Sequence, residues 1–311
     1  MFTALADNPH LRQIVSPSES IQLHEKIQRT LNPSTAPKLT YRRRRGELKT
    51  LSHWGQKKLL LSEIEFLTLY VAAVAPPSAP LSTSTSTSTL TPALTTYTCL
   101  YAGASPGDHI PYLCYLFPHV HFILVDPRPF CYRLNNPALR PPNVTLCQEL
   151  MTAAVIAEFN THAPGNGKDS ACKRGSSNNN GSDNGSDSKV LLFISDIRSA
   201  DWQTLGSHTA MDEEVQNDMS LQKEWHLALQ PTASMLKFRL PWTGGCTRYL
   251  RGTVYFPVYG PLGTSETRLV VSDTVATPQE KEKEEKEMEE EVWYDHQTYW
   301  EQLFYFNSIT R

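Results

Sequence analysis

Two lysines and two carboxylates, Lys58, Asp196, Lys237 and Glu266, are the residues of this chain best suited to proton-transfer chemistry. A lysine acts as a general base when burial or nearby positive charge destabilises its ammonium, so that the neutral amine becomes accessible. Lys237 lies in the apolar segment Met235–Phe238 and is the candidate base. We expect Asp196 to orient its amine, and Lys58 and Glu266 to complete a hydrogen-bonded ring that fixes a substrate hydroxyl. Taken singly, each residue also has an ordinary interpretation as a surface lysine, a helix-capping aspartate or a solvated glutamate.

A glycine-containing segment, 101–107, is the second candidate site. Gly103 and Gly107 remove side chains where a ligand must approach the backbone, and the helix predicted to follow supplies free N–H groups. About twenty residues later Asp126 ends the next predicted strand, where it can accept both ribose hydroxyls of an adenosine. This arrangement serves NAD and S-adenosylmethionine (AdoMet) alike. The pattern is G-x-x-P-G rather than G-x-G-x-x-G, which favours AdoMet; a tight turn without a ligand is the alternative. Arg128 could pack on the adenosine or be an ordinary surface arginine.

Alternating strand and helix patterns position these residues. Apolar residues three and four apart predict a helix over 56–74, which carries Lys58. Further helices are predicted at 18–31, 109–117 and 212–229, and strands at 97–101, 122–125, 144–146, 190–194, 233–238, 253–259 and 268–271. Such alternation predicts an α/β fold with a mostly parallel, seven-stranded sheet and helices on both faces. Functional groups should then gather at the carboxyl ends of the strands, where Asp126, Asp196 and Lys237 fall.

Length and composition indicate one globular domain that carries inserts. Of the 311 residues 40% are hydrophobic, a low fraction because three stretches contain almost no large apolar side chains. We expect an N-terminal arm over 1–50 and a domain over 51–311, with disordered inserts at about 76–96, 163–188 and 278–291.

Charge and cysteine usage restrict the function classes. The net charge is −3, but the run 280–291 holds eight glutamates and three lysines, so the rest of the chain carries about +2 and is compatible with RNA. The basic cluster 42–45 suits either RNA phosphates or nuclear import. Six scattered cysteines without a C-x-x-C pair favour reduced thiols in an intracellular protein over disulfides or zinc, so no metal is expected. There is no apolar run of transmembrane length, and no membrane partner is expected.

The order of these segments resembles the family of poxvirus-type cap-specific mRNA 2′-O-methyltransferases, which also serve as poly(A) polymerase regulatory subunits. The similar segments are Gly55–Glu63, Tyr101–His109, Ile194–Ser199, Ala233–Arg239, Ser265–Leu269 and Leu303–Arg311. The resemblance implies a Rossmann-like AdoMet-dependent methyltransferase fold. It also implies an enzyme that methylates a ribose 2′-hydroxyl near the 5′ cap, with the two lysines, Asp196 and Glu266 as its catalytic set.

The resemblance assigns further residues to cofactor and cap. The implied cofactor-binding residues are Gln56, Tyr101, Gly103, Ser105, Pro106, Gly107, His109, Asp126, Arg128 and Asp196. In this family a methylated guanine is clamped between aromatic rings, because the cationic base stacks strongly. Trp242 stands where one ring is expected; Tyr41 is the expected opposing ring, and Arg239 an expected RNA contact. Gly244 occupies the place of the acidic residue that reads the guanine edge, which leaves Asp295 or Glu301 near the last helix.

The implied partners are 5′-capped RNA and, as a second class, other capping or polyadenylation proteins. The low-complexity inserts, and related ribose methyltransferases in kinetoplastid capping, suggest a cellular member; a cellular member is expected in the nucleus and a viral one in the cytoplasm. Two other functions stay open. One is a non-catalytic, RNA-binding subunit with a methyltransferase fold that supports a polymerase such as poly(A) polymerase. The other is an NAD-linked oxidoreductase, which the loop sequence disfavours.

Overall fold

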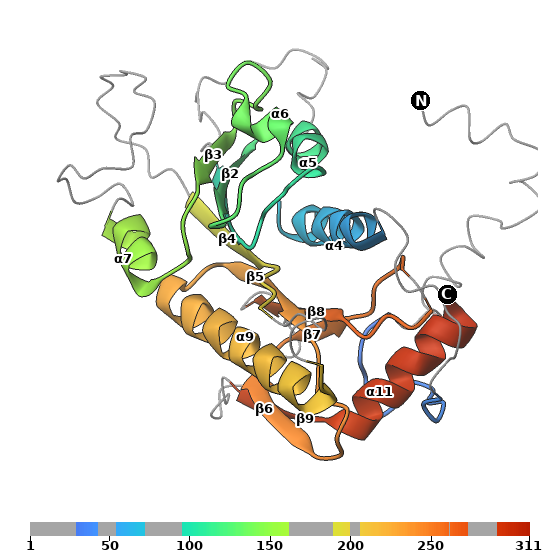
Figure 1. Ribbon diagram of the computed structural model, residues 1–311. Helices are drawn as coiled ribbons and strands as arrows, with labels where there is room; N and C mark the ends of the chain where they lie inside the picture. The colour runs from blue at the N-terminus through green and yellow to red at the C-terminus, as the bar shows by residue number, and fades with distance from the viewer. Residues whose placement is uncertain are drawn as a thin grey trace, which may run out of the picture.

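A seven-stranded sheet in the order β3-β2-β1-β4-β5-β8-β7 forms the centre of the molecule (Figure 1). The computed structural model describes residues 29–42, 54–71, 95–161, 189–199, 206–260, 262–272 and 291–311. The strands are β1 (Thr96–Ala102), β2 (Val120–Val125), β3 (Val144–Cys147), β4 (Lys189–Ser195), β5 (Ala233–Phe238), β7 (Thr253–Tyr255) and β8 (Thr267–Ser272). Strands β1 to β5 are parallel, and β8 is antiparallel to both of its neighbours. The prediction of a mixed α/β fold with a mostly parallel sheet of seven strands is confirmed.

Helices cover both faces of this sheet. They are α4 (Trp54–Tyr70), α5 (Ile110–Leu116), α6 (Tyr132–Asn135), α7 (Ala153–Thr161), α9 (His208–Leu229) and α11 (His296–Tyr305), the last continuing into a π-helical turn, Phe306–Thr310. Figure 1 shows α4 and α5 on one side of the sheet and α7 and α9 on the other. Side chains alternate along β1 accordingly: Cys99 and Tyr101 pack in the core beneath α4 and α5, whereas Leu100 and Ala102 pack in the core beneath α9.

The strand order reverses between β1 and β4. From β1 the chain proceeds outward to β2 and β3, and it then returns through β4 to build the other half of the sheet. In open α/β sheets, ligands bind in the crevice outside the carboxyl ends of the strands at such a switch point. The segment that follows β1 and the residue that follows β4 therefore border the expected ligand crevice.

A second, two-stranded sheet was not predicted. It joins β6 (Cys246–Leu250) and β9 (Glu291–Asp295) in antiparallel register. The ribbon packs inward through Tyr249 and Tyr294, which belong to the core around Phe238. The prediction of a disordered insert over 278–291 is wrong for its last residue, because Glu291 is the first residue of β9. The segment 273–290 lies outside the described residues.

Several predicted boundaries are corrected. The strand predicted over 253–259 ends at Tyr255, the last residue that pairs with β8, and Pro257 has no N–H to offer a neighbouring strand. The helix predicted over 56–74 is α4, ending at Tyr70. The helix α7 was not predicted. Most of the helix expected at 18–31 and of the inserts at 76–96 and 163–188 lies outside the described residues, although Thr96 opens β1.

Part of the expected N-terminal arm packs against the domain. Thr30 bridges Tyr255 in antiparallel fashion, and Leu31 N donates to Val254 O over 2.9 Å. The Arg29 guanidinium forms an ion pair with Glu65 of α4. Further along the segment, Asn32 O accepts from Gln302 Nε2 over 2.6 Å and Leu39 N donates to Glu301 O over 3.2 Å. The segment therefore runs from the edge strand β7 to the C-terminal helix α11.

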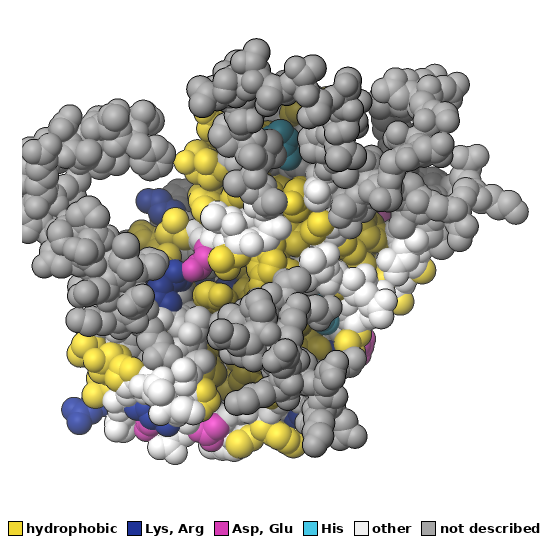
Figure 2. All heavy atoms as spheres, turned by 180° about the vertical axis from the view of Figure 1, so that it is seen from behind, with side chains coloured by type: hydrophobic (Ala, Val, Ile, Leu, Met, Phe, Trp, Pro, Cys, Tyr) yellow, Lys and Arg dark blue, Asp and Glu magenta, His cyan; other side chains and the backbone are white. Residues whose placement is uncertain are grey.

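The surface of the described residues is mixed in character. Figure 2 shows the side opposite to that of Figure 1, where acidic and basic side chains lie beside one another in small groups among apolar ones. Within the described ranges, no helix has both the length and the apolar character needed to span a membrane.

Candidate active site

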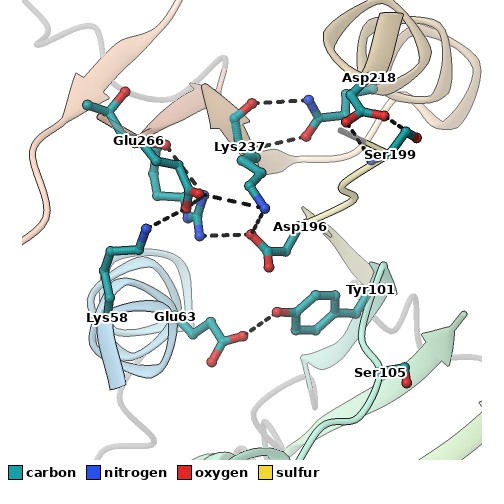
Figure 3. A network of polar contacts seen from close by, with 12 residues as sticks. Lys58, Glu63, Tyr101, Ser105, Asp196, Ser199, Asp218, Lys237 and Glu266 are labelled. Carbon is teal, nitrogen blue, oxygen red and sulfur yellow. Dashed lines mark hydrogen bonds and ion pairs between the residues drawn. The ribbon is translucent and has the colours of Figure 1, made fainter. Parts of the chain in front are cut away.

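Four side chains from four separate segments meet at the carboxyl end of the sheet (Figure 3). Lys58 Nζ lies 2.8 Å from Glu266 Oε1. Lys237 Nζ lies 3.2 Å from Asp196 Oδ1 and 3.7 Å from Glu266 Oε2. Their side chains are between 14% and 20% exposed, so each of them is largely buried but still reaches solvent. The structure therefore brings together the four residues that the sequence singled out for proton transfer.

The sheet topology explains this convergence. Asp196 is the first residue after β4, Lys237 lies near the end of β5, and Glu266 directly precedes β8. Because β4, β5 and β8 are consecutive in the sheet, these three positions are neighbours. Lys58 arrives from the side, in the second turn of α4, which contacts β5.

A fifth charged residue, Arg268, completes the group and was missed by the sequence analysis. Its guanidinium lies 2.8 Å from both Asp196 Oδ1 and Glu266 Oε1, and its side chain is 5% exposed. Arg268 is the register partner of Lys237. A signal was present: in an extended strand, residues two apart point to the same face, so Glu266 and Arg268 had to share a side. We call these five residues the charged cluster.

The charged cluster contains three cationic side chains and two carboxylates. Burial lowers the pKa of Lys58; Arg268 and Lys237 add to the effect, and Glu266 opposes it. Burial disfavours the ionised form of Glu266, but the surrounding Lys237, Lys58 and Arg268 outweigh it and hold the pKa of this carboxyl well below its usual range. An arginine does not lose its proton in proteins. Lys58 is therefore the amine of the cluster that its surroundings shift towards the neutral form.

The glycine loop lies directly against the segment that carries Asp196. Gly103 has a φ of +78°, and a Cβ placed on it would lie 2.8 Å from the backbone of Asp196 and Ile197. Only glycine permits this approach without displacing one of the two segments. Asp196 N also donates to Ala102 O over 3.0 Å. The loop and the charged cluster are thus parts of a single site.

Asp126 is 2% exposed and lies below the loop at the end of β2. Its Oδ1 accepts hydrogen bonds from Arg128 N and Nε, and its Oδ2 accepts them from Ser105 N and Arg128 Nη2. Burial opposes its ionisation, yet these donors, those of Arg128 first, lower the pKa of the Asp126 carboxyl. A carboxylate has about four acceptor positions. All four are used here, so a ribose hydroxyl can bind only where Arg128, whose side chain is 61% exposed, gives way.

Tyr101 and His109, two of the expected cofactor contacts, both meet a buried carboxylate instead of an open cavity. Tyr101 Oη donates to Glu63 Oε1 over 2.6 Å, and His109 Nε2 lies 3.0 Å from the same oxygen. Glu63 is fully buried. Burial disfavours the protonated form of His109, but the Glu63 carboxylate outweighs this effect and raises the pKa of His109. Glu63 lies on α4, so this network connects the helix that carries Lys58 to both ends of the loop. No role was predicted for Glu63 from the sequence.

Of the remaining expected cofactor residues, Ser105, Pro106 and Gly107 belong to the loop and Gln56 belongs to α4. Gln56 is half-buried in the first turn of α4. Ser105 Oγ donates to Pro129 O over 2.8 Å, and Pro106 O accepts from Cys131 N over 2.8 Å. Their contact with a cofactor stays a prediction.

A cluster of aromatic side chains contains both rings expected at the cap site. Trp242 stacks on Trp300 with ring centroids 3.6 Å apart and planes 10° apart. Tyr41 lies 4.8 Å from Trp242 at 48°, and 5.4 Å from Phe304. Trp300 is fixed by a 2.7 Å hydrogen bond from Nε1 to Pro241 O. The expected pair Tyr41 and Trp242 is therefore brought together, and Trp300, which the sequence analysis did not consider, covers one face of Trp242.

Arg239, the expected RNA contact, is held by α9. Its Nη2 donates to Asp212 Oδ1 over 2.6 Å, while Asp212 Oδ2 accepts from Trp242 N over 3.1 Å. The two expected acidic readers have other hydrogen-bond partners: Asp295 caps α11 through Thr298 N, and Glu301 accepts from Gln297 Nε2. Asp212 is the carboxylate that contacts the Trp242 backbone, and its two hydrogen bonds connect the segment 239–242 to α9.

Within the described part of the chain, no group of three or more histidine, cysteine, aspartate or glutamate side chains could hold a metal ion. The charged cluster has only two carboxylates and three cations, a composition that repels a metal cation.

Comparison with known proteins found no matching family model and no matching curated protein. Among solved structures, the chain is similar to bluetongue virus VP4, described as a multifunctional RNA-capping production line. The TM-score is 0.42 with 13% sequence identity, over 88% of this chain and 34% of the VP4 chain. The chain thus spans about a third of the length of that protein.

Proposed function

We propose that this chain is an AdoMet-dependent RNA 2′-O-methyltransferase that acts on a ribose near the 5′ cap. The observation that carries the proposal is the meeting of Lys58, Asp196, Lys237 and Glu266 in one charged cluster beside the glycine loop. The order 3-2-1-4-5 of the parallel strands supports a Rossmann-like fold, and Asp196 directly follows β4, one of the two strands at the switch point.

The cluster is suited to activating a hydroxyl group. Lys237 takes the proton of the ribose 2′-hydroxyl, and Asp196, 3.2 Å away, orients the amine that receives it. Glu266 holds Lys58 and Lys237 together, so that the attacking 2′-oxygen of the ribose is fixed between two amines. Arg268 supplies the third positive charge, which favours the neutral form of one lysine.

The residues around the loop fit AdoMet. When bound, this cofactor supplies an electrophilic methyl group on a sulfonium. Gly103 allows the loop to touch the Asp196 segment, which leaves the Asp196 carboxylate next to the loop and able to face a positive sulfonium. Asp126 is the acceptor for the ribose hydroxyls, with Arg128 moving from the carboxylate onto the exposed side of the adenosine. The Glu63 network holds Tyr101 and His109 beneath the loop and keeps its two ends in place.

The aromatic cluster is the proposed cap site. A base that stacks between two rings needs about 7 Å between them, twice the contact distance of roughly 3.5 Å. Tyr41 lies 4.8 Å from Trp242 and 6.2 Å from Trp300, while the two tryptophan rings are 3.6 Å apart, so the Tyr41 ring lies beside the edge of the tryptophan stack. It has to swing over the face of Trp242 to form the second wall, which its 40% exposure permits. Trp242 is held in place from the other side by Trp300. The methylated guanine therefore stacks on the face of Trp242 that Trp300 does not cover, and Tyr41 closes over it.

The test is incubation of the protein with labelled AdoMet and RNA that carries a methylated cap, an unmethylated cap or no cap, followed by nuclease mapping. We expect label on a ribose 2′-oxygen near the cap, with capped RNA preferred. Lys237→Met should abolish transfer. The matched control Lys223→Met, which removes a lysine of α9 that pairs with Glu291 of β9, should not. RNA binding without any transfer would reject the enzyme and favour the non-catalytic subunit.

A further inference from the structure

The strands β4 and β5 separate where the charged cluster begins. Their pairing ends with Ser195 opposite Leu236. The next residue of the first strand, Asp196, leaves the sheet, while the next residue of the second, Lys237, continues along β5 opposite Arg268 of β8. Lys237 therefore has a strand on one side only. On the other side its backbone N–H and C=O need partners, because a buried peptide group without them is costly.

A single side chain of α9 supplies both partners. Gln222 Nε2 donates to Lys237 O over 3.0 Å, and Lys237 N donates to Gln222 Oε1 over 3.0 Å. Gln222 is 1% exposed. Its amide takes the place that a peptide group of a neighbouring strand would have, and the two bonds appear as dashed lines at the backbone of Lys237 in Figure 3.

Beyond Ser195 and Leu236 a gap opens between β4 and β5, and the Asp196 segment on its far side is held by the preceding turn of α9. Asp218, which is 6% exposed, accepts a 2.9 Å hydrogen bond from Ser199 N and a 2.7 Å bond from Ser199 Oγ. Ser199 follows Asp196 by three residues (Figure 3). Residues four apart lie on one face of a helix, so Asp218 and Gln222 reach the Asp196 segment and Lys237 from a common base.

We propose that Gln222 is a positioning residue: with Asp218 it sets the placement of Lys237 relative to Asp196. The inference rests on the proposed function of Lys237 as the base. The helix is a firm support, with an N-terminal cap at Ser207 and with Met219 and Trp225 in the core. A displacement of about 1 Å in a reacting group costs on the order of 100-fold in rate, so loss of this support should reduce kcat strongly.

The test compares three variants with the wild-type chain. Gln222→Met removes both hydrogen bonds at similar size and should lower kcat by about 10- to 100-fold, with KM for AdoMet and RNA within about twofold. Gln216→Met is the matched control: it is the same substitution on the same helix, at an amide that contacts Met219 Sδ, and should leave kcat unchanged. Gln222→Glu is the conservative variant. A loss confined to KM, or an unchanged kcat in Gln222→Met, would overturn the inference.

The Gln222→Glu variant gives a readout that a purely structural role would not move. A protonated carboxyl donates to Lys237 O and accepts from Lys237 N as the amide does, whereas an ionised one can only accept. Burial raises the pKa of such a carboxyl. The titratable groups around it are Asp218 and His226 on α9, and Lys237 and Asp196 across the gap. The ratio of variant to wild-type kcat should be near one at about pH 6 and fall at least tenfold by about pH 9; a flat ratio would overturn the inference.

A second measurement separates this inference from the proposed function. The rate at which a small acylating reagent modifies Lys237, measured by mass spectrometry against the exposed Lys57, reports the position and charge of the amine without any methyl transfer. We expect its pH dependence to change in Gln222→Met and not in Gln216→Met. A wild-type chain without transferase activity would reject the proposed function alone; identical Lys237 labelling in all variants would reject the role of Gln222. If Gln222→Met does not fold, Gln222→Glu at low and high pH remains the deciding comparison.

Discussion

Replacement of Arg268 by methionine tests the charge balance of the cluster. Arg268 and Lys237 share the acceptor Asp196 Oδ1 at 2.8 and 3.2 Å, so the two cationic groups lie at most 6.0 Å apart. At that distance two unit charges repel by about 0.7 kcal/mol at a dielectric constant of 80 and by about 2.8 kcal/mol at 20. Without Arg268, the carboxylates Asp196 and Glu266 also have only the lysines as cationic partners within the cluster, which stabilises the protonated amines. Both effects favour the protonated amines.

We therefore expect the Arg268→Met variant to have about 3- to 100-fold less neutral amine near neutral pH, since 1.4 kcal/mol corresponds to a factor of ten. A lysine that acts as a base and holds its proton more tightly becomes active only at higher pH. The rising limb of the kcat profile should therefore move to higher pH, while kcat at high pH recovers much of the loss.

The assay is single-turnover methyl transfer between about pH 6 and pH 10, with calorimetric AdoMet binding as the check on the cofactor site. Arg268→Lys keeps the charge but loses one of the two contacts, and should shift the limb less than methionine does. Arg248→Met removes an arginine that is half exposed on β6 and serves as the matched control. Because each charge-assisted bond of Arg268 contributes about 1.5–3 kcal/mol, melting temperatures have to be measured on all three. A folded Arg268→Met variant whose rising limb coincides with that of the wild type would refute the charge-balance argument.

Three further outcomes are expected. Asp126→Ala should weaken AdoMet binding about 10- to 100-fold in calorimetry, since bonds to a charged acceptor contribute roughly 1.5–3 kcal/mol; unchanged affinity would reject this pocket. Trp242→Ala should weaken binding of RNA with a methylated cap by about 1–3 kcal/mol and of RNA with an unmethylated cap much less; equal losses, with a lowered melting temperature, would make Trp242 a packing residue only. The pKa of His109 is raised by Glu63, so their ion pair stabilises the fold fully below the unfolded pKa of about 6.5, and the contribution is lost as pH rises through the folded pKa. The stability difference between wild type and His109→Gln, followed by chemical denaturation, should therefore shrink from acidic to alkaline pH, and a constant difference would contradict it.

The local elements of the fold were predictable wherever they carry their own pattern. The apolar run that forms β4 and the segment that forms β5 lie close to their expected positions, because a strand buried on both faces shows itself as a short apolar stretch. The ribbon of β6 and β9 was missed for the opposite reason. Its strands are half exposed and of mixed composition, and Cys246 and Asp295 become partners only when the chain between them is closed.

The candidate site divides in the same way. The residue types and their order along the chain indicated Lys58, Asp196, Lys237 and Glu266 without any coordinates. The aromatic pair was also indicated, although Trp300, which covers one face of Trp242, was not. A tryptophan within a helix has no mark in the sequence that distinguishes a core residue from a binding-site residue.

The sequence by itself determined which chemical groups are available and which strand or helix carries each of them, since both follow from residue type and local periodicity. Only the tertiary structure decided which groups are partners. Lys58 and Glu266 are 208 positions apart, and Asp196 and Arg268 are 72 apart. Such pairs depend on the order of strands in the sheet and on the small shifts that close a hydrogen bond. Neither is encoded in a local pattern, because a contact at this range forms only when the whole sheet has assembled.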